Sequence, residues 1–205
     1  MEQTDKERFI LGITGGVGAG KSRVLAILEQ DYGFHVIQAD EVAKRLMLPG
    51  MEGFRAVTAC LGPSILKEDG SIDRAIMADM IFNDLDKRRK IDGLTHPLTL
   101  EAMLAEARSA DSCRVVMEAA IPSKEFRDNC QEMWYVYTSR ENRMARLKEN
   151  RGYTEEKSQS IMRNQVPEET FRRFADAVID NDGPLEETKV QIDMLLRGKA
   201  GQRNI

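Results

Sequence analysis

A glycine-rich segment near the start of the chain restricts the possible folds more than any other feature. It reads GITGGVGAGKSR over residues 12–23 and follows the short apolar run FILGIT at residues 9–14. An apolar run of this length between polar residues and glycines predicts a buried strand. The residues after the glycines have the apolar spacing of a helix that stops at Gly33. A strand, a loop poor in side chains and a helix in this order are the setting of a phosphate-binding loop.

The loop matches the pattern G-x-x-x-x-G-K-[ST]. Its matching positions are Gly15, Gly16, Val17, Gly18, Ala19, Gly20, Lys21 and Ser22. Glycines let backbone N–H groups approach phosphate oxygens, and the start of the following helix adds positive potential there. We expect Lys21 to bridge the β- and γ-phosphates of ATP and Ser22 to bind Mg²⁺. Arg23, the next residue, is included in the predicted ATP site. A turn that merely joins strand and helix is the alternative, and the full match in this setting weighs against it.

The overall composition favours a globular cytoplasmic protein. The 205 residues carry 30 basic and 34 acidic side chains, which gives a formal charge of −4 and argues against a nucleic-acid partner. Hydrophobic residues make up 41% of the chain, enough to bury a core. The 3 cysteines form no C-x-x-C pair, which favours a reduced compartment over a disulfide framework or a zinc site. Neither a signal peptide nor a membrane span is expected, because the apolar runs are too short.

Strand and helix patterns alternate at both ends of the chain. A second strand is expected over residues 34–40, with a helix after it that Pro49 and Gly50 end. Further strands are expected at residues 113–121, at 133–139 and shortly before the last helix. Between them, residues 52–110 indicate several helices, with Asp73 as an N-cap and a junction between two helices at Pro97. This order predicts an α/β fold with a parallel sheet covered on both faces and a helical insertion.

Two acidic residues are candidates for chemistry at the ends of strands. Asp40 ends the second predicted strand, where parallel sheets bind ligands, and could accept a proton from a hydroxyl or hold Mg²⁺ through water. It could equally be the N-cap of a helix that begins at Glu41. Glu118 ends the apolar run RVVM and could belong to a second metal-binding strand. A loop carboxylate is the somewhat favoured alternative.

An arginine-rich segment follows the fourth predicted strand and bends at Gly152. Its basic side chains are Arg140, Arg143, Arg146, Lys148 and Arg151. Several of them share a helix face and could form a lid that excludes water and neutralises phosphate charge. Any single one of them is more simply a solvated residue paired with Glu141 or Glu149. Of the two histidines, His35 favours a structural role and His96 is a weak candidate for substrate contact.

Taken together, these segments resemble the dephospho-CoA kinase family. The quoted loop, VIQAD with Asp40, GSIDR, HP, NRMARLKENRGYT, RNQ and ADAVIDNDG occur in the family's order, and the resemblance covers residues 9–196. The phosphate loop alone is common to a large superfamily. The aspartate after strand two, the Asp73-Arg74 and His96-Pro97 pairs and the late AD…N.G segment are more specific.

This resemblance implies a particular reaction and layout. The reaction is transfer of the ATP γ-phosphate to the 3′-hydroxyl of dephospho-CoA, with ATP and Mg²⁺ required. The layout is one three-layer P-loop unit, with its core at about 8–50, 112–139 and 175–198, a helical CoA-binding insertion at 52–110 and a lid at 140–172. The implied site residues are Asp40 as catalytic base, Arg74 and His96 toward the substrate, Arg146 at the phosphates and Asn181 near adenine.

The chain departs from the family pattern at residues 117–126. There MEAAIPSKEF stands where leucines and then a glutamate are usual, so Glu125 is assigned no role. Arg23 also replaces a usual threonine. Another P-loop kinase of nucleosides or nucleotides, and a kinase-like protein that only binds, remain alternatives. A GTP-dependent switch is a further one, although the chain has no N-K-x-D stretch to recognise guanine.

Overall fold

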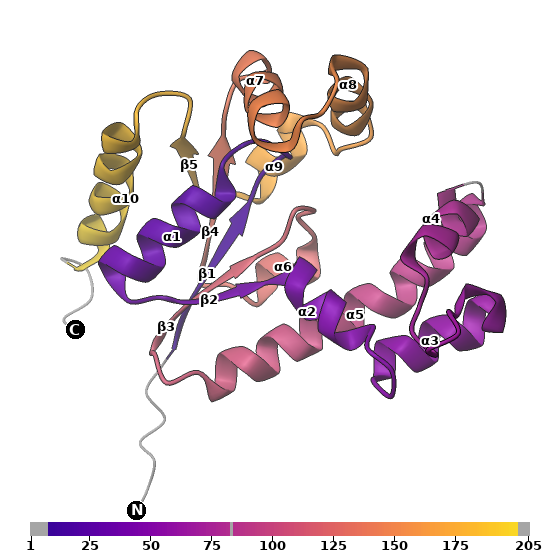
Figure 1. The fold of residues 1–205 in the computed structure, drawn as a ribbon. Helices are drawn as coiled ribbons and strands as arrows, with labels where there is room; N and C mark the ends of the chain where they lie inside the picture. Colours follow the sequence, from indigo (N-terminus) through magenta and orange to yellow (C-terminus); the bar gives the residue numbers. More distant parts are fainter. Residues whose placement is uncertain (1–7, 83, 201–205) are drawn as a thin grey trace, which may run out of the picture. The chain divides into compact units, whose positions relative to one another are not determined.

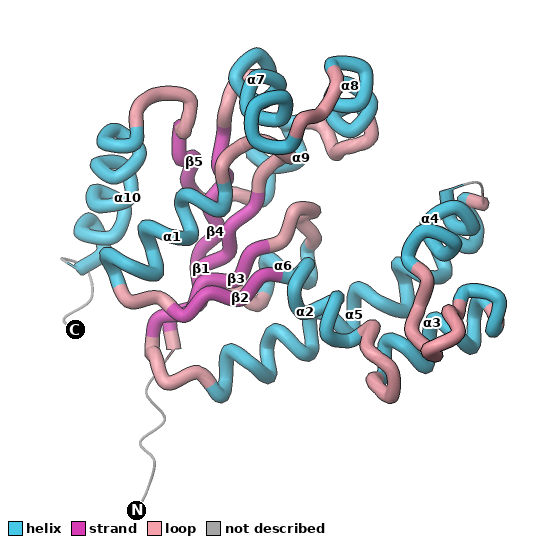
Figure 2. The backbone as a smooth tube through the Cα atoms, viewed as in Figure 1, coloured by secondary structure: helices cyan, strands magenta, loops and turns pink. Residues whose placement is uncertain are grey.

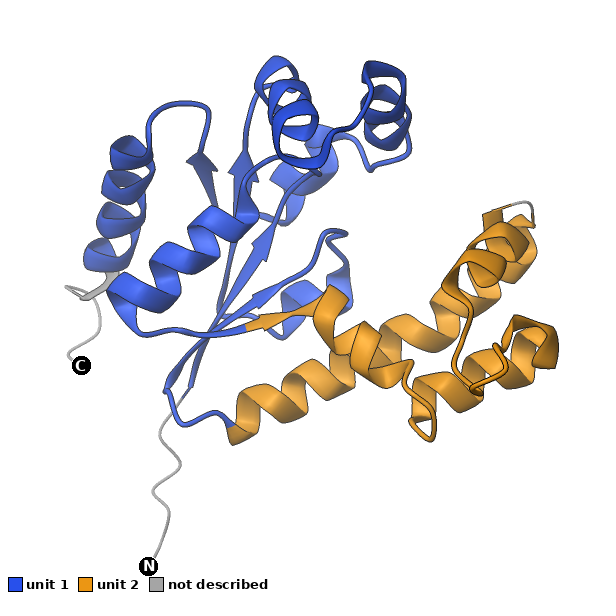
Figure 3. Ribbon diagram, in the orientation of Figure 1, with its two compact units in different colours: residues 1–36, 110–205 blue, residues 37–109 orange. Residues whose placement is uncertain are grey.

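The computed structural model describes residues 8–82 and 84–200 (Figure 1). The chain divides into two compact units (Figure 3). Unit 1 comprises Met1–Val36 and Ala110–Ile205, and unit 2 comprises Ile37–Ser109. The expected helical insertion at 52–110 thus falls almost wholly within unit 2, which begins before it.

A five-stranded sheet organises the fold, with the strands in the order β2-β3-β1-β4-β5 (Figure 2). The strands are β1 (Phe9–Thr14), β2 (His35–Gln38), β3 (Arg114–Glu118), β4 (Glu132–Tyr137) and β5 (Ala177–Asp180). β1 pairs in parallel with both β3 and β4, so that Ile13 lies opposite Glu118 on one side and Trp134 on the other. The predicted parallel sheet is confirmed, and the glycine loop follows its central strand.

Helices cover both faces of the sheet in unit 1. They are α1 (Lys21–Tyr32), α6 (Lys124–Asp128), α7 (Arg140–Arg151), α8 (Glu155–Arg163), α9 (Glu168–Phe174) and α10 (Leu185–Ala200). On one face, Leu11 and Ile13 pack with Leu28 of α1 and Ile192 of α10. On the other, the ring of Tyr135 stacks on Phe171 of α9, with ring centroids 5.1 Å apart. Alternate residues of a strand point to opposite faces, and these buried strands have apolar neighbours on both.

The unusual segment at residues 117–126 comprises the end of β3, a connection and the start of the short helix α6. Ser123 is the N-cap of α6, and its hydroxyl accepts a hydrogen bond from the N–H of Phe126. Phe126 is buried where β1 has Gly12, and a Cβ on that glycine would lie 3.3 Å from the phenyl ring and 2.9 Å from Cys130 Sγ. Burial also raises the pKa of the Cys130 thiol to about 12. The segment therefore packs on the sheet without the leucines usual in the family.

Unit 2 is helical and has its own apolar cluster. Its elements are the end of β2, α2 (Ala39–Leu46), α3 (Glu52–Leu61), the 3₁₀ turn η1 (Pro63–Ile65), α4 (Arg74–Phe82) and α5 (Leu85–Ser109). Val57, Ile65 and Ile91 are buried together in this cluster. Asp73 caps α4 as predicted, since its Oδ1 accepts hydrogen bonds from the N–H groups of Ala75 and Ile76.

The predicted junction between two helices at Pro97 is wrong. Pro97 lies inside the single helix α5, on its exposed side. A proline there removes one backbone hydrogen bond, but Ile91, Thr99 and Met103 are buried along the opposite side of the same helix. Burial of this face offsets the local cost. Across the part of the chain that the structure describes, no helix is both long and apolar enough to cross a membrane.

We predict opposite stability effects for two glycine-to-alanine substitutions. Gly33 ends α1 with φ 69°, and its N–H bonds to the carbonyl of Glu29, so Gly33→Ala should destabilise the fold by about 1–2 kcal/mol. Gly93 lies within α5, where an added Cβ meets no atom within 4 Å, so Gly93→Ala should stabilise by about 0.5–1 kcal/mol. Thermal unfolding of both variants tests this prediction. A change of stability in the same direction for both variants would contradict it.

Candidate active site

The glycine loop occupies the turn between β1 and α1. α1 begins at Lys21, and Gly20 is its N-cap with φ 88°. A Cβ at Gly20 would lie only 2.1 Å from the side-chain nitrogen of Asn181. Glycine is therefore required at this position both by the left-handed backbone and by the close approach of a side chain. The predicted strand, loop and helix are confirmed at these boundaries.

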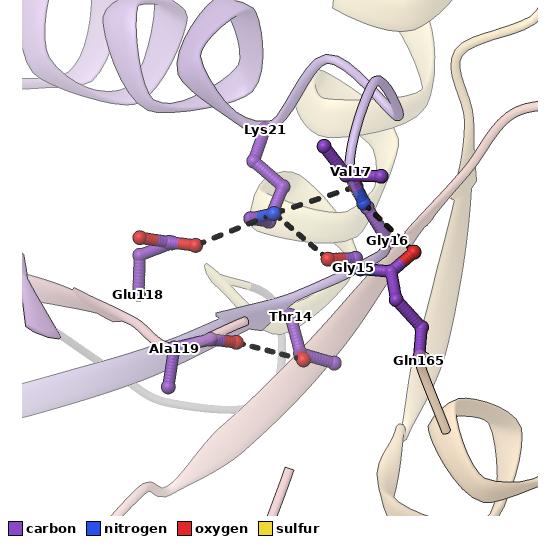
Figure 4. A network of polar contacts seen from close by, with 8 residues as sticks. All are labelled: Thr14, Gly15, Gly16, Val17, Lys21, Glu118, Ala119 and Gln165. Carbon is purple, nitrogen blue, oxygen red and sulfur yellow. Dashed lines mark hydrogen bonds and ion pairs between the residues drawn. The ribbon is translucent and has the colours of Figure 1, made fainter. Parts of the chain in front are cut away.

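Lys21 lies between a loop carbonyl and a buried carboxylate (Figure 4). Its Nζ donates a hydrogen bond to the Gly15 carbonyl at 2.7 Å and lies 3.5 Å from Glu118 Oε1. Glu118 is the last residue of β3 and is only 5% exposed. The next residue is tied to β1, because the Thr14 hydroxyl donates to the Ala119 carbonyl at 2.8 Å. The loop-carboxylate alternative for Glu118 is wrong: the ends of two paired strands place it beside the loop lysine.

The carbonyl of Ala19, near the C-terminal end of the loop, accepts several hydrogen bonds. Asn181 Nδ2 donates to it at 2.8 Å, the Thr138 hydroxyl at 3.0 Å and Arg146 Nη1 at 3.5 Å. Arg146 Nη2 also donates to the Asn181 carbonyl at 2.6 Å. Asn181 is fully buried, and its Oδ1 accepts from the Thr188 hydroxyl at 3.0 Å. Two predicted ATP-site residues, Arg146 and Asn181, are thus brought together against the loop.

The backbone of Val17 is held from the arginine-rich segment. Arg143 Nε donates to the Val17 carbonyl at 2.8 Å, and the Val17 N–H donates to Gln165 Oε1 at 3.2 Å. Arg143 Nη2 donates to the same Gln165 oxygen at 2.6 Å. Gln165 lies between α8 and α9, and no role was predicted for it. The RNQ segment was the sequence feature that could have drawn attention to Gln165. It could not reveal that the partner of Gln165 is Val17, 148 positions away.

The N-terminus of α7 is tied to the turn after β5. Ser139 is its N-cap, and Asp182 Oδ1 accepts from the Ser139 N–H at 3.0 Å and from Asn142 Nδ2 at 2.7 Å. The Asn142 amide, followed by the Ser139 groups, holds the pKa of Asp182 below its ordinary value. The helix that carries Arg143 and Arg146 is therefore fixed at the end nearest the sheet. Gly152 ends the same helix with φ 61°, which agrees with the predicted bend.

The remaining predicted residues lie in exposed helical positions. Ser22 and Arg23 are in the first turn of α1, and Arg140, Lys148 and Arg151 are exposed on α7. In unit 2, Arg74 begins α4, and His96 lies on α5 with Nε2 3.9 Å from Asp92 Oδ1.

Both structural expectations for Asp40 are wrong. β2 ends at Gln38 and α2 begins at Ala39, so Asp40 neither ends the strand nor caps the helix. Gln38 is the N-cap, and Asp40 lies exposed in the first turn of α2. A carboxylate there interacts favourably with the positive end of the helix dipole. The strand ends two residues before the predicted end, because Ala39 and Asp40 belong to α2.

These features define a P-loop kinase: the glycine loop follows the central strand, its lysine meets a strand-end carboxylate, and arginines come from the helices after β4. Solved structures share the fold. A Thermus thermophilus crystal structure has a TM-score of 0.80 at 25% identity and covers 94% of this chain and 98% of its own. A shikimate kinase from Acinetobacter baumannii, at 18% identity over 95% of this chain and 96% of its own, shares the fold with a TM-score of 0.56.

Sequence comparison identifies the family. The dephospho-CoA kinase family model matches residues 9–187. A dephospho-CoA kinase of Geobacter metallireducens is 36% identical, with 90% of this chain and 93% of the relative covered. One of Geobacillus kaustophilus is 34% identical, with 91% and 94% covered. The chain belongs to the dephospho-CoA kinase family, which confirms the resemblance found in the sequence.

We predict that Asn181 stabilises the fold through the loop. Asn181→Ala removes the amide that links Ala19 to Thr188 and leaves buried polar groups without that partner. The free energy of unfolding should fall by about 1–3 kcal/mol, measured by urea denaturation. Asn164→Ala, at an exposed asparagine that ends α8, is the control and should change it by less than about 0.5 kcal/mol. Equal losses in the two variants would contradict the role of the buried amide.

Proposed function

We propose that this protein transfers the γ-phosphate of ATP to the 3′-hydroxyl of dephospho-CoA, giving CoA and ADP. The observation that carries the proposal is the Lys21–Glu118 pair at the phosphate loop of a chain that matches this family over residues 9–187. A kinase for another small acceptor is the alternative, since the fold alone is shared with kinases of different substrates.

The 3 free cysteines, Cys60, Cys113 and Cys130, support a cytoplasmic location, and no nucleic-acid partner is expected.

The phosphate loop would act mainly by electrostatics and positioning. ATP phosphates bind over the loop, where backbone N–H groups and the start of α1 provide positive potential. Lys21 bridges the β- and γ-phosphates and stabilises the charge that develops during transfer. Its present contacts with Gly15 and Glu118 hold the ammonium at the end of the central strands. Arg146 and Asn181 act on the nucleotide site through the Ala19 carbonyl that they hold.

The residues beside the loop fit a magnesium ion. Ser22 offers a hydroxyl and Glu118 a carboxylate, and Mg²⁺ prefers such oxygen donors. Mg²⁺ in kinases keeps several waters and binds substrate phosphates, so one or two protein ligands suffice. Among the described residues, no group of three or more acidic, histidine or cysteine side chains could hold a metal. Bound there, the ion would neutralise charge on the β- and γ-phosphates.

Asp40 is proposed as the general base, with Arg74 and His96 as contacts of the acceptor. Asp40 stands two residues after the end of β2, and ligands of open parallel sheets bind beyond the carboxyl ends of the strands. Its carboxylate is exposed in the first turn of α2, where it can accept a proton from a hydroxyl. Arg74 and His96 lie in the same helical unit.

An ADP-release assay with Mg-ATP tests the proposed reaction. ADP should form with dephospho-CoA and not with nucleoside monophosphates or shikimate. Asp40→Asn should fold normally and lose about 10²–10⁴-fold in turnover, because the general base is removed. Asp79→Asn, at an exposed aspartate of α4, is the control. Turnover with a different acceptor would show that dephospho-CoA is not the substrate. Wild-type turnover in Asp40→Asn would show that Asp40 is not the general base.

A second prediction concerns the magnesium requirement. Glu118→Gln should raise the Mg²⁺ concentration for half-maximal activity by about 10–100-fold, because a carboxylate that supports the ion is lost. Glu125→Gln, at an exposed glutamate of α6, should leave it unchanged. If Glu118→Gln alters only the KM of ATP, Glu118 serves Lys21 alone and the magnesium assignment is wrong.

A further inference from the structure

We propose that Arg143 and Gln165 are a positioning pair that sets the affinity for ATP by fixing the backbone of Val17. The inference rests on the proposed function to the extent that ATP is the ligand of the phosphate loop. It assigns no contact between this pair and the reacting atoms. The pair acts through the loop that binds the phosphates.

The pair and one loop residue close a ring of three hydrogen bonds. Arg143 Nε donates to the Val17 carbonyl at 2.8 Å, Arg143 Nη2 donates to Gln165 Oε1 at 2.6 Å, and the Val17 N–H donates to Gln165 Oε1 at 3.2 Å. Both backbone polar groups of Val17 are therefore held by the two side chains. The planar guanidinium is suited to this task because its N–H groups have a fixed spacing.

The guanidinium also lies directly against the backbone of Gly16. A Cβ on Gly16 would be 2.5 Å from Arg143 Nη2 and 2.7 Å from its Cζ. A side chain at this position would therefore have to displace the guanidinium from its place beside Val17. Burial lowers the pKa of Arg143, in agreement with a guanidinium withdrawn from water. Hydrogen bonds in such surroundings compete less with solvent and hold their partners more firmly.

Both members of the pair come from segments that are fixed elsewhere in unit 1. Gln165 stands just before α9, whose Phe171 is 3% exposed and stacks on Tyr135 with the rings only 7° from parallel. Arg143 is one turn into α7, beyond the cap formed by Ser139 and Asp182. The ring joins α7, the α8–α9 connection and the phosphate loop at one point. A shift of either segment must therefore move or release Val17.

This arrangement holds the loop from the side opposite Lys21. Lys21 and Glu118 fix the sheet side of the loop, whereas the Val17 N–H is turned to Gln165 (Figure 4). A glycine-rich loop has many accessible conformations, and binding must restrict them at a cost in affinity. Holding Val17 beforehand removes part of that cost. The expected consequence is a change in ATP affinity without a change in the chemical step.

Equilibrium titration with Mg-ATP in the absence of acceptor tests the inference. Gln165→Leu removes the shared acceptor, and Arg143→Lys keeps the charge but cannot span both oxygens. Each should raise the Kd of ATP roughly 10-fold, and the double variant should show about the same loss, because the ring is broken once. In turnover assays the KM of ATP should rise, whereas kcat and the KM of the acceptor should stay unchanged. Gln159→Leu and Arg163→Lys on α8 are the matched controls.

Each outcome decides a separate point. An unchanged Kd in both single variants overturns the inference, as does a double variant that loses about 100-fold, which would mean independent contacts. A lower kcat with an unchanged KM of ATP would indicate a merely structural role and also overturns it. If Gln165→Leu does not fold, Gln165→Asn shortens the same amide and is measured instead. A wild-type protein that binds ATP but does not phosphorylate dephospho-CoA refutes the proposed function and leaves this titration readable.

Discussion

The position of the Lys21 ammonium is the constraint on which the rest of the site depends. Two parallel strands, β1 and β3, end side by side. The residue after β1 supplies the Gly15 carbonyl, 2.7 Å from the Lys21 nitrogen, and the last residue of β3 supplies the Glu118 carboxylate at 3.5 Å. Glu118 is 5% exposed, so a charged group is kept out of water beside a charge of opposite sign. A buried charge without such a partner would be strongly unfavourable. The register of the central strands thus fixes the position of the Lys21 ammonium. β4 is the other neighbour of β1, and the helices that contact the loop follow it.

Few side chains in the loop itself can pack, so its order comes from residues far away in the sequence. Glycine gives the backbone freedom that must be restricted when the protein folds. Three attachments restrict it here: Lys21 to Glu118 at the sheet, Asn181 and Arg146 at the Ala19 carbonyl, and Arg143 and Gln165 at Val17. All of them attach to backbone carbonyls, to a backbone N–H group or to the ammonium group of Lys21. The side chain of Val17 is not needed by any of these bonds, which explains how a phosphate loop tolerates variable residues between its glycines.

The sequence was sufficient to predict the strand, the loop and α1, because glycine, lysine and apolar spacing are local signals. Asp73 as the cap of α4 was predictable for the same reason. Local signals failed at Pro97, which lies inside α5 because the opposite side of that helix is buried. They also misplaced Asp40, since Gln38 and not Asp40 is the N-cap of α2. The ordered α6 was missed because its stability comes from Phe126 packing against Gly12, a contact between distant residues. Gln165 was missed for a similar reason, since its partner is a backbone group on another element.

The polar residues that hold the loop also affect how firmly the site is defined. A fully buried amide such as Asn181 tolerates few alternative arrangements, because its polar groups are costly to leave unpaired. Its donor and acceptor must meet Ala19 and Thr188 together, and an arrangement that satisfies only one leaves a buried polar group unpaired. The Arg143–Gln165–Val17 ring has the same property. The Asn181 network is satisfied only when the residue after β5, α7, α10 and the loop are correctly placed, and the ring only when α7, the α8–α9 connection and the loop are. The loop that binds the phosphates and the helices that follow β4 are therefore selected as a single arrangement.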